Sequence, residues 1–352
     1  MIHVLMVGVG KKRVGGMSAV AEVYLHSSVY NKNVKMKYIP TSTNGPIVFR
    51  IVYMLIGYIR IIAHLLFTRI DLVHVHMAEK GSTFRKGVVV KTAKKMGKKV
   101  VIHLHAGAFV KWYNSVDVTR KRKIQSIFEC SDAVVVLGKY WKKELAKIVP
   151  SSKIVAIYNG ASIPTKNNYS VSSRNITYFG VLRKEKGTYD LLESIKKIDS
   201  RLDKSVKVLL CGNDLEGDFK KKIAEYNLEN RVRLLGWVSD DKKKDILKAS
   251  MINVLPSYFE GLSMTIIEGM SYGIPTVTTN ISTMPEILGE YKYLITPGDA
   301  STMAKYILEL TNNPRERADI SNYVYSRAKR LFSEESFISN TLMLYNRIVG
   351  KK

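Results

Sequence analysis

This chain of 352 residues has only two cysteines and lacks the common nucleotide-binding motifs. Its two cysteines, Cys130 and Cys211, lie far apart in apolar surroundings, which argues against a disulfide framework and predicts buried thiols in a reducing compartment. A dinucleotide-binding motif is excluded because Arg13 stands where its third glycine, after Gly8 and Gly10, should be. The Gly-Lys-Ser/Thr of a phosphate loop is missing as well. By motif, the chain is therefore neither an NAD enzyme nor an ordinary NTPase.

Acidic residues are also few. The chain has 30 Asp and Glu but 56 Lys and Arg, which gives a net charge of +26. The excess lies in the first part of the chain, where residues 1–160 contain 27 basic and 7 acidic side chains, a net of +20. We infer a polyanionic partner for this half: a membrane surface, a phosphate-bearing substrate or a nucleic acid. The alternative is lysine used only as a solubiliser, which would not by itself concentrate the excess on one side.

Apolar stretches of strand length alternate with amphipathic helical stretches along the whole chain. Its length suits two domains of roughly 150 to 200 residues each. Near-continuous apolar strands that alternate with helices predict parallel sheets covered on both faces. Residues 159–175, rich in Asn, Ser, Pro and Gly, predict a linker. The sequence thus predicts an α/β protein of two similar domains, with a ligand cleft between the carboxyl ends of two parallel sheets.

The segment "PSYFEGLSMTIIEGMSYGIP" (256–275) places two acids in an apolar stretch, where an unpaired carboxylate would be costly. Glu260 lies on the expected strand-to-helix loop, and Glu268 lies about 12 Å further along the helix. Gly261 lets the backbone approach a ligand closely. Carboxylates accept hydrogen bonds from sugar hydroxyls, so these groups fit a nucleotide sugar. The helix start would also offer unpaired amide donors to its diphosphate, those of Leu262, Ser263 and Met264.

The same segment resembles the donor motif of retaining glycosyltransferases of family 4, in which seven residues separate two glutamates. The resemblance implies the GT-B fold, two Rossmann-like domains with parallel sheets that face a central cleft. It implies an acceptor-binding domain at 1–165, with a last helix at about 335–352 packed back on it, and a nucleotide-sugar-binding domain at 170–332. Four further segments extend the resemblance over nearly the whole chain: VGGMS (14–18), VVIHLHAG (100–107), GVLRKEKGTYDLL (180–192) and STMPEIL (282–288).

The resemblance assigns roles to individual residues. Glu260 is expected to bind hydroxyls of the transferred sugar, Glu268 the ribose of the nucleotide, and Lys186 the diphosphate. His105 is expected to reach the transferred sugar from the opposite domain. The backbone of Gly15–Gly16 is expected to border the phosphates and the acceptor.

One position departs from the family pattern, because Val181 stands where arginine commonly follows the glycine of the basic loop. Arg183 stands two residues later and could supply a guanidinium to the phosphate oxygens from a shifted position. Its alternative is a solvated loop charge. Lys184 is expected to face solvent.

The implied reaction is transfer of a hexosyl group from a nucleoside diphosphate sugar to a hydroxyl, with the anomeric configuration retained. Lys186 and the helix amides would stabilise the charge that builds on the leaving diphosphate. The resemblance therefore implies no metal and no cofactor beyond this co-substrate. No enzymic nucleophile is identifiable in the sequence, so the resemblance implies a same-face displacement, while a double displacement stays open. Cell-surface polysaccharide synthesis is the implied setting.

Four histidines occur with two-residue spacing on two strands that we expect to be neighbours: His74, His76, His103 and His105. Such a group could bind a metal ion. No acid or cysteine at matching spacing completes a ligand set, so we expect hydrogen-bonded histidines and no metal. His105, at the end of its strand, is the one that we expect to be functional.

The apolar stretch 47–67 is long enough to span a membrane, but Arg50, Arg60 and His64 lie inside it. A central arginine costs roughly 2.5 to 3.5 kcal/mol on insertion, which argues against spanning. Two interpretations remain, a helix that covers the first sheet and a helix that lies in the membrane interface. The charge of the same half favours peripheral attachment to an anionic membrane.

We therefore expect a cytoplasmic protein on the inner face of the plasma membrane. Residues 1–10 agree with this, because the lysines follow the apolar run, an order typical of a first strand and not of a signal peptide. The acceptor would be a lipid-linked diphosphate saccharide. "GSTFRKG" (81–87) is the candidate site for its phosphates, through helix-start amides, Arg85 and Lys86.

Two other functions compete with this interpretation. A nucleic-acid-binding protein would fit the charge, but the basic residues are spread, without aromatic residues interleaved among them and without a recognised module. We therefore expect no nucleic-acid partner. A nucleotide-sugar epimerase of similar two-domain shape is the alternative enzyme, and it would change the sugar without any acceptor.

Overall fold

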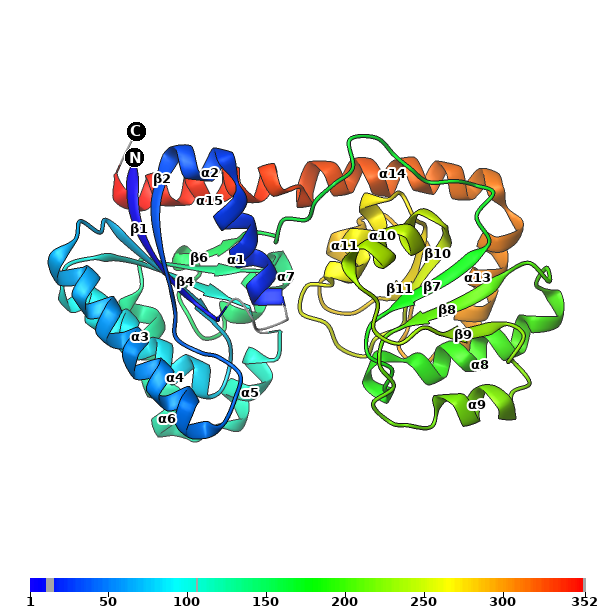
Figure 1. Ribbon diagram of the computed structural model, residues 1–352, viewed down its shortest axis with the longest axis horizontal. Coiled ribbons are helices and arrows are strands. Elements are labelled where there is room, and N and C mark those ends of the chain that lie inside the picture. Colours follow the sequence, from blue (N-terminus) through cyan, green and yellow to red (C-terminus); the bar gives the residue numbers. More distant parts are fainter. Residues whose placement is uncertain (11–15, 106, 351–352) are drawn as a thin grey trace. The chain divides into compact units, whose positions relative to one another are not determined.

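The chain folds as two α/β units, shown in Figure 1. The first unit comprises Met1–Gly160 and Glu334–Lys352, and the second comprises Ala161–Ser333. The chain first changes unit at Gly160–Ala161, a few residues before the boundary that we expected. The computed structural model describes three stretches of the chain, residues 1–10, 16–105 and 107–350.

The first unit is built on a sheet of six parallel strands in the order β2-β1-β3-β4-β5-β6. Its strands β3, β4 and β5 are almost wholly buried, as expected for a parallel sheet with helices on both faces. The strand order reverses between β1 and β3, so this unit has the doubly wound topology. The strands are β1 (Ile2–Gly8), β2 (Val34–Pro40), β3 (Leu72–Met77), β4 (Lys99–Leu104), β5 (Ala133–Val136) and β6 (Ile154–Ala156).

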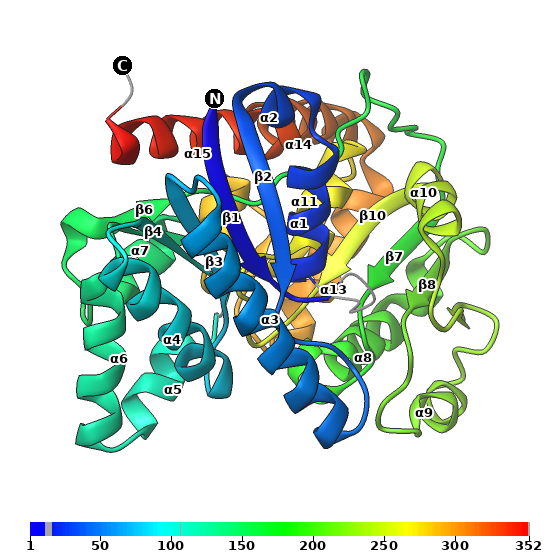
Figure 2. The same cartoon turned by 60° about the vertical axis from the view of Figure 1, so that its left-hand side comes forward.

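Helices cover both faces of this sheet: α1, α2 and α15 lie on one face, and α3, α4 and α6 lie on the other (Figure 2). Helix α4 ends near Gly97, whose positive φ of 72° suits the residue after a helix. The helices are α1 (Gly16–His26), α2 (Ser28–Asn33), α3 (Ile47–Phe67), α4 (Gly81–Lys95), α5 (Phe109–Ser115), α6 (Val118–Cys130), α7 (Lys139–Leu145) and α15 (Glu334–Val349).

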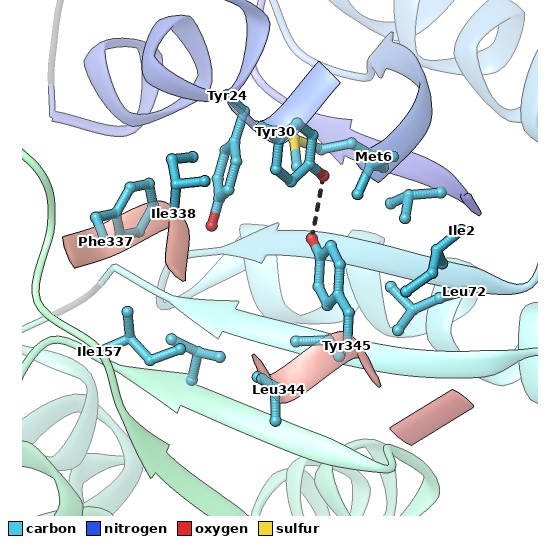
Figure 3. Packing of buried hydrophobic residues seen from close by; sticks show 14 of the residues in the cluster. Ile2, Met6, Tyr24, Tyr30, Leu72, Ile157, Phe337, Ile338, Leu344 and Tyr345 are labelled. Atoms are coloured by element: carbon cyan, nitrogen blue, oxygen red, sulfur yellow. Dashed lines mark hydrogen bonds between the residues drawn. The ribbon is translucent and has the colours of Figure 1, made fainter. Parts of the chain in front are cut away.

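The carboxyl-terminal helix α15 packs into the core of the first unit, as Figure 3 shows. Its Tyr345 is fully buried, and its hydroxyl lies 3.4 Å from that of Tyr30 in α2. The hydroxyl of Tyr24 in α1 lies 3.2 Å from Oγ1 of Thr341 in α15. Buried tyrosines need such partners for their hydroxyls, so these contacts fix how α15 lies against α1 and α2.

Helix α3 is exposed along most of its length. Only Gly57, Ile61 and Leu65 are buried, at a spacing of four residues that marks one narrow face. Gly57 rests against the end of β2, where a Cβ would lie 3.0 Å from the carbonyl oxygen of Pro40. By length and composition α3 could cross a membrane, and little of it is buried inside the protein. It therefore contributes little to the core of the first unit.

The second unit has a sheet of six parallel strands in the order β12-β11-β10-β7-β8-β9. The strand order reverses between β7 and β10, again a doubly wound topology. The prediction of two Rossmann-like domains with parallel sheets is confirmed. The strands are β7 (Asn175–Phe179), β8 (Lys207–Cys211), β9 (Val232–Leu234), β10 (Ser250–Leu255), β11 (Thr276–Thr279) and β12 (Leu294–Ile295).

Amphipathic helices cover this second sheet as well, with α8, α9 and α13 on one face and α10, α11 and α14 on the other (Figure 1). In α8, Leu191, Leu192 and Ile195 are fully buried, and their spacing puts them on one apolar face of the helix. The helices are α8 (Thr188–Ile198), α9 (Phe219–Glu225), α10 (Asp240–Lys248), α11 (Met264–Ser271), α12 (Met284–Leu288), α13 (Ala300–Asn312) and α14 (Pro314–Phe332).

Candidate active site

The candidate site of the second unit lies where the strand order of its sheet reverses, at the carboxyl ends of β7 and β10. In doubly wound sheets, ligands bind in the crevice at this point, because the loops there diverge to opposite faces of the sheet. The loop after β7 is residues 180–187, which includes the basic segment. The loop after β10 is residues 256–263, which includes Glu260. The two segments singled out in the sequence are therefore neighbours.

Lys186 and Glu260 form an ion pair across these two loops. Lys186 Nζ lies 2.6 Å from Glu260 Oε1, and the buried Ser257 donates its hydroxyl to the same oxygen over 2.8 Å. The Glu260 side chain is only 12 % exposed. A largely buried carboxylate is tolerated when it is paired and hydrogen-bonded in this way. The acid in this apolar segment is thus held as a charged group at the loop.

The backbone fixes the distance between the two loops. The amide of Tyr258 donates to the carbonyl oxygen of Glu185 over 3.0 Å. Gly187 follows Lys186 with φ of +66°, and a Cβ there would lie only 2.0 Å from the carbonyl oxygen of Pro256. Only glycine fits this close approach in the left-handed conformation. Gly187 thereby positions Lys186 beside Glu260.

The start of α11 continues the loop of Glu260. Thr283 Oγ1 donates to the carbonyl oxygen of Gly261 over 3.0 Å, which holds the peptide before the helix. The side chain of Ser263 caps α11 by accepting from the amide of Ile266 over 3.4 Å. The amides of Leu262, Ser263 and Met264 lie at this helix start, where N–H groups have no intrahelical partners. They are suited to bind an anionic group of a ligand.

Glu268 lies further along α11 and forms an ion pair with Lys243 of α10. The Lys243 ammonium also lies 5.5 Å from the ring centroid of Phe179 at the end of β7. We did not predict Lys243 from the sequence, because it lies in a charge run, 240–245, that reads as a solvated helix face. The helical period alone does not show which of these lysines points back toward α11.

Arg183 does not join this group of charges. Its Nε lies 2.8 Å from Glu185 Oε2, and the side chains of Arg183 and Glu185 are 42 % and 62 % exposed. Its amide donates to Thr188 Oγ1 over 3.1 Å, so its backbone belongs to the turn that opens α8. A phosphate role for Arg183 stays a prediction. Lys184 is exposed, as expected.

His105 follows β4 in the first unit, and its amide donates to the carbonyl oxygen of Met77 over 2.9 Å. Its Nε2 lies 2.8 Å from His76 Nδ1. Burial lowers the pKa of His105 to about 3, so the ring is neutral near pH 7. The sugar contact expected of His105 stays a prediction. Gly15 lies outside the described residues, and Gly16 begins α1.

The four histidines stack on one another. The rings of His76 and His103 are 5.2 Å apart, those of His76 and His105 are 5.0 Å apart, and those of His103 and His105 are 4.1 Å apart, with interplanar angles of 24–29°. Ring nitrogens of His74, His76 and His103 all lie within 4.8 Å of one another. Within this group the rings of His74 and His103 are tilted by 50°. Among the described residues, neither ring nitrogen of His103 has a hydrogen-bond partner, in contrast to the hydrogen-bonded histidines that we expected. The absence of a metal stays a prediction.

Two family models match consecutive parts of the chain. The model of glycosyl transferases group 1 matches residues 162–327, and the model of glycosyltransferase family 4 matches residues 21–163. These two ranges agree closely with the second and first units of the fold. Each family model therefore corresponds to one structural unit of the chain.

Three relatives with named activities are glycosyltransferases. The chain is 26% identical to the MMP alpha-(1->4)-mannosyltransferase of Mycolicibacterium hassiacum over 47% of this chain and 41% of that protein. It is 25% identical to the O-antigen chain mannosyltransferase B of Escherichia coli over 56% and 53%. It is 27% identical to the UDP-Gal:alpha-D-GlcNAc-diphosphoundecaprenol alpha-1,3-galactosyltransferase of Escherichia coli over 60% and 58%. The chain thus spans about half the length of these relatives.

Solved structures of similar fold cover the whole chain. The sucrose-phosphate synthase of Thermosynechococcus elongatus superposes with a TM-score of 0.77 at 17% identity, covering 100% of both chains. HepE of Anabaena in complex with UDP superposes with a TM-score of 0.76 at 16% identity, covering 99% of this chain and 100% of that chain. Both matches include the two doubly wound units. The chain belongs to the group 1 glycosyltransferases and has the two Rossmann-like units of the GT-B fold.

Proposed function

We propose that this protein transfers a hexosyl group from a nucleoside diphosphate sugar to a hydroxyl of a lipid-linked saccharide, in cell-surface polysaccharide synthesis. The observation that carries the proposal is the Lys186–Glu260 ion pair at the reversal point of the second sheet, with Glu268 on the helix that follows. A carboxylate for sugar hydroxyls, an ammonium for a diphosphate and helix-start amides are thereby gathered at one loop edge. HepE, of the same fold, has been solved with bound UDP.

The residues would divide the donor among them. Glu260 accepts hydrogen bonds from hydroxyls of the transferred sugar, and Glu268 accepts from the ribose. Lys186, with the amides of Leu262–Met264, neutralises the diphosphate. In the free protein each acid is paired with a lysine, so donor binding exchanges these ion pairs for contacts with the ligand. Arg183, once released from Glu185, would be a further cation for the phosphates.

The transfer would proceed with retention of the anomeric configuration. The bond between the anomeric carbon and the diphosphate oxygen breaks, and the bond to the acceptor oxygen forms on the same face of the sugar. The proton of the acceptor hydroxyl passes to the leaving phosphate oxygen. Charge that builds on the diphosphate is stabilised by Lys186 and the helix amides, so no metal ion is required.

The acceptor would be held at a membrane. Most apolar side chains of α3 are exposed, from 45 % for Ile62 to 83 % for Phe67. Arg50 and Arg60 on the same helix, and the net charge of +20 on residues 1–160, favour an anionic surface. Of the two interpretations of α3, the exposure supports the interfacial one. We place the protein on the inner face of the plasma membrane, and the galactosyltransferase relative is named for a diphosphoundecaprenol acceptor.

The test is a transfer assay with a panel of UDP and GDP sugars and a polyprenyl diphosphate saccharide in vesicles. We expect one donor to yield a longer saccharide, with the new linkage in the anomeric configuration of the donor by NMR. Conversion of a nucleotide sugar into its epimer without any acceptor would contradict the proposal. So would a product of inverted configuration, which would refute the same-face displacement.

A further inference from the structure

A hollow of about 130 Å³ lies in the first unit, between the loop after β2 and helices α3 and α4. One wall consists of the hydroxyl-bearing residues 41–43 at the carboxyl end of β2. The second wall is the apolar start of α3, with Ile47, Ile51 and Met54. Two arginines complete the lining, Arg50 from α3 and Arg85 from α4. The hollow thus combines two guanidinium groups with hydroxyls and a hydrocarbon wall.

The two arginines are not neutralised by the protein. Among the residues that the structure describes, no carboxylate lies within 4.0 Å of either guanidinium. Arg85 folds back along α4 toward its first turn, since a Cβ on Gly81 would lie 2.9 Å from Arg85 Nη1. Arg85 can take this position because Gly81 has no side chain. Two guanidinium groups without acidic partners at one hollow favour an anionic ligand.

Contacts between elements hold the hollow in shape. The hydroxyl of Tyr58 in α3 donates to the carbonyl oxygen of Arg85 over 2.6 Å. One residue earlier, Gly57 lets α3 touch the backbone of Pro40 at the end of β2. These contacts join α3 to α4 and to β2, the three elements that line the hollow. The arginines are thus presented on a common frame.

Lys86 does not take part, in contrast to our expectation that it would join Arg85 at a phosphate. Its side chain is buried, 4 % exposed, and Nζ donates to the carbonyl oxygen of Gly8 over 2.9 Å. Burial, and to a smaller extent the nearby Arg85, lower the pKa of Lys86 to about 7. Lys86 therefore acts inside the unit, at the end of β1. Arg50 replaces it as the second cation of the surface hollow.

We propose that Arg50 and Arg85 bind a phosphoryl group that is attached to a lipid, and that the hollow at the start of α3 is the phosphate subsite of the membrane-borne acceptor. Guanidinium groups suit phosphate oxygens because their planar forks can donate two hydrogen bonds each. The apolar wall selects a phosphate that carries a hydrocarbon chain, because Ile47 and Ile51 continue into the exposed apolar face of α3. This inference rests on the proposed function for the identity of the acceptor only.

The test measures vesicle binding, not transfer, so it stays informative if the protein transfers no sugar. The probes are phosphatidylcholine vesicles that contain a long-chain polyprenyl diphosphate and vesicles that contain phosphatidylglycerol of equal total charge. We expect the wild type to prefer the polyprenyl diphosphate vesicles. We expect Arg50→Gln and Arg85→Gln each to weaken this binding about tenfold, the effect of losing one charge-assisted hydrogen bond. Binding to phosphatidylglycerol should fall by at most about fivefold, the ~1 kcal/mol of one basic residue near an anionic surface.

Arg60→Gln is the matched control, because it removes the same charge from the same helix outside the hollow. We expect it to leave the preference for polyprenyl diphosphate unchanged. Inorganic pyrophosphate in solution should compete only weakly, since it lacks the hydrocarbon part. Three results would overturn the proposal: equal loss in Arg60→Gln, equal wild-type binding to both vesicles, or full competition by pyrophosphate. Unchanged affinity for nucleotide in Arg50→Gln and Arg85→Gln, measured by calorimetry, separates this subsite from the donor site.

Discussion

Lys186 Nζ donates a hydrogen bond to Glu260 Oε1 over 2.6 Å, although the two residues are 74 positions apart in the chain. Because Ser257 donates to the same oxygen, the charge of Glu260 is compensated before any ligand arrives. A ligand that binds here must offer donors to Glu260 and an anion to Lys186. A sugar joined to a diphosphate offers both.

The two glutamates should be separable by mutation. We expect Glu260→Ala to lower transfer by ~10²–10³ while nucleoside diphosphate still binds, because its partner is the sugar. Glu268→Ala should weaken nucleotide binding itself, since its partner is the ribose. Calorimetry with UDP and GDP, together with transfer rates, checks both, and Glu229→Ala on the exposed surface is the control. Unimpaired nucleotide affinity in Glu268→Ala would refute its assignment.

Turnover should survive chelation. If Lys186 and the amides at the start of α11 carry the charge of the leaving diphosphate, excess EDTA should leave the rate within about twofold, whereas loss of one such donor costs ~10²–10³. The measurement is the transfer rate before and after dialysis against EDTA. A loss of activity that manganese or magnesium restores would show that a metal ion carries this charge instead.

Gly187 should tolerate no side chain. We expect Gly187→Ala to destabilise the second unit by more than the ~1–3 kcal/mol of a strained backbone, because its Cβ would also collide with the carbonyl oxygen of Pro256. Gly217→Ala is the matched control, since Gly217 has a φ of +79° and nothing within 4 Å of its Cβ position. Thermal unfolding of both variants separates collision from strain. Equal shifts in melting temperature for Gly187→Ala and Gly217→Ala would mean that the loop at Pro256 moves to accommodate the new methyl group.

The histidine stack should make the first unit sensitive to acid. Burial holds the pKa of His103 well below 6.5 in the folded protein. As the pH falls through about 6.5, the unfolded ring binds a proton and the folded ring does not, so stability present above this pH is lost on acidification. Each such histidine lowers the free energy of unfolding by up to ~1.4 kcal/mol per pH unit.

His103→Leu tests this dependence. Neither ring nitrogen of His103 has a hydrogen-bond partner among the described residues, so leucine costs no hydrogen bond there. We expect little change in stability at pH 7.5 and a flatter loss between pH 6.5 and 5 than in the wild type, measured by urea unfolding. An unchanged slope in His103→Leu would mean that its ring is protonated in the folded protein.

Helix α3 should bind anionic membranes. We expect binding to vesicles that contain anionic lipid and not to neutral ones, at ~1 kcal/mol per basic residue near the surface. The binding should weaken in 1 M salt, where the Debye length is ~3 Å. Replacement of Ile56, Ile59 and Leu66 by Ser should reduce it without unfolding, because all three are at least half exposed. If the wild-type protein does not bind anionic vesicles at low salt, the prediction of peripheral membrane attachment is wrong.

The sequence by itself determined the local features of this protein. Apolar strands alternating with helices predicted two parallel α/β units, because strands with both faces covered must be apolar throughout. The segment around Glu260 and Glu268 predicted a strand-to-helix loop, which the structure shows after β10, and its role as a donor site stays a prediction. The apolar start of the chain predicted β1.

Only the tertiary structure decided which charges meet. Glu260 forms an ion pair with Lys186 because the strand order of the sheet brings β7 beside β10. Glu268 forms an ion pair with Lys243 because packing sets the rotation of α10. Arg183 forms an ion pair with Glu185, whereas its neighbour Lys184 is exposed. Lys86 points inward and donates to the carbonyl oxygen of Gly8, whereas its neighbour Arg85 is exposed. Periodicity tells which residues share a face, but not which face the rest of the fold leaves uncovered. For that reason the exposure of α3 was also decided in three dimensions, by the few contacts that the first unit makes with it.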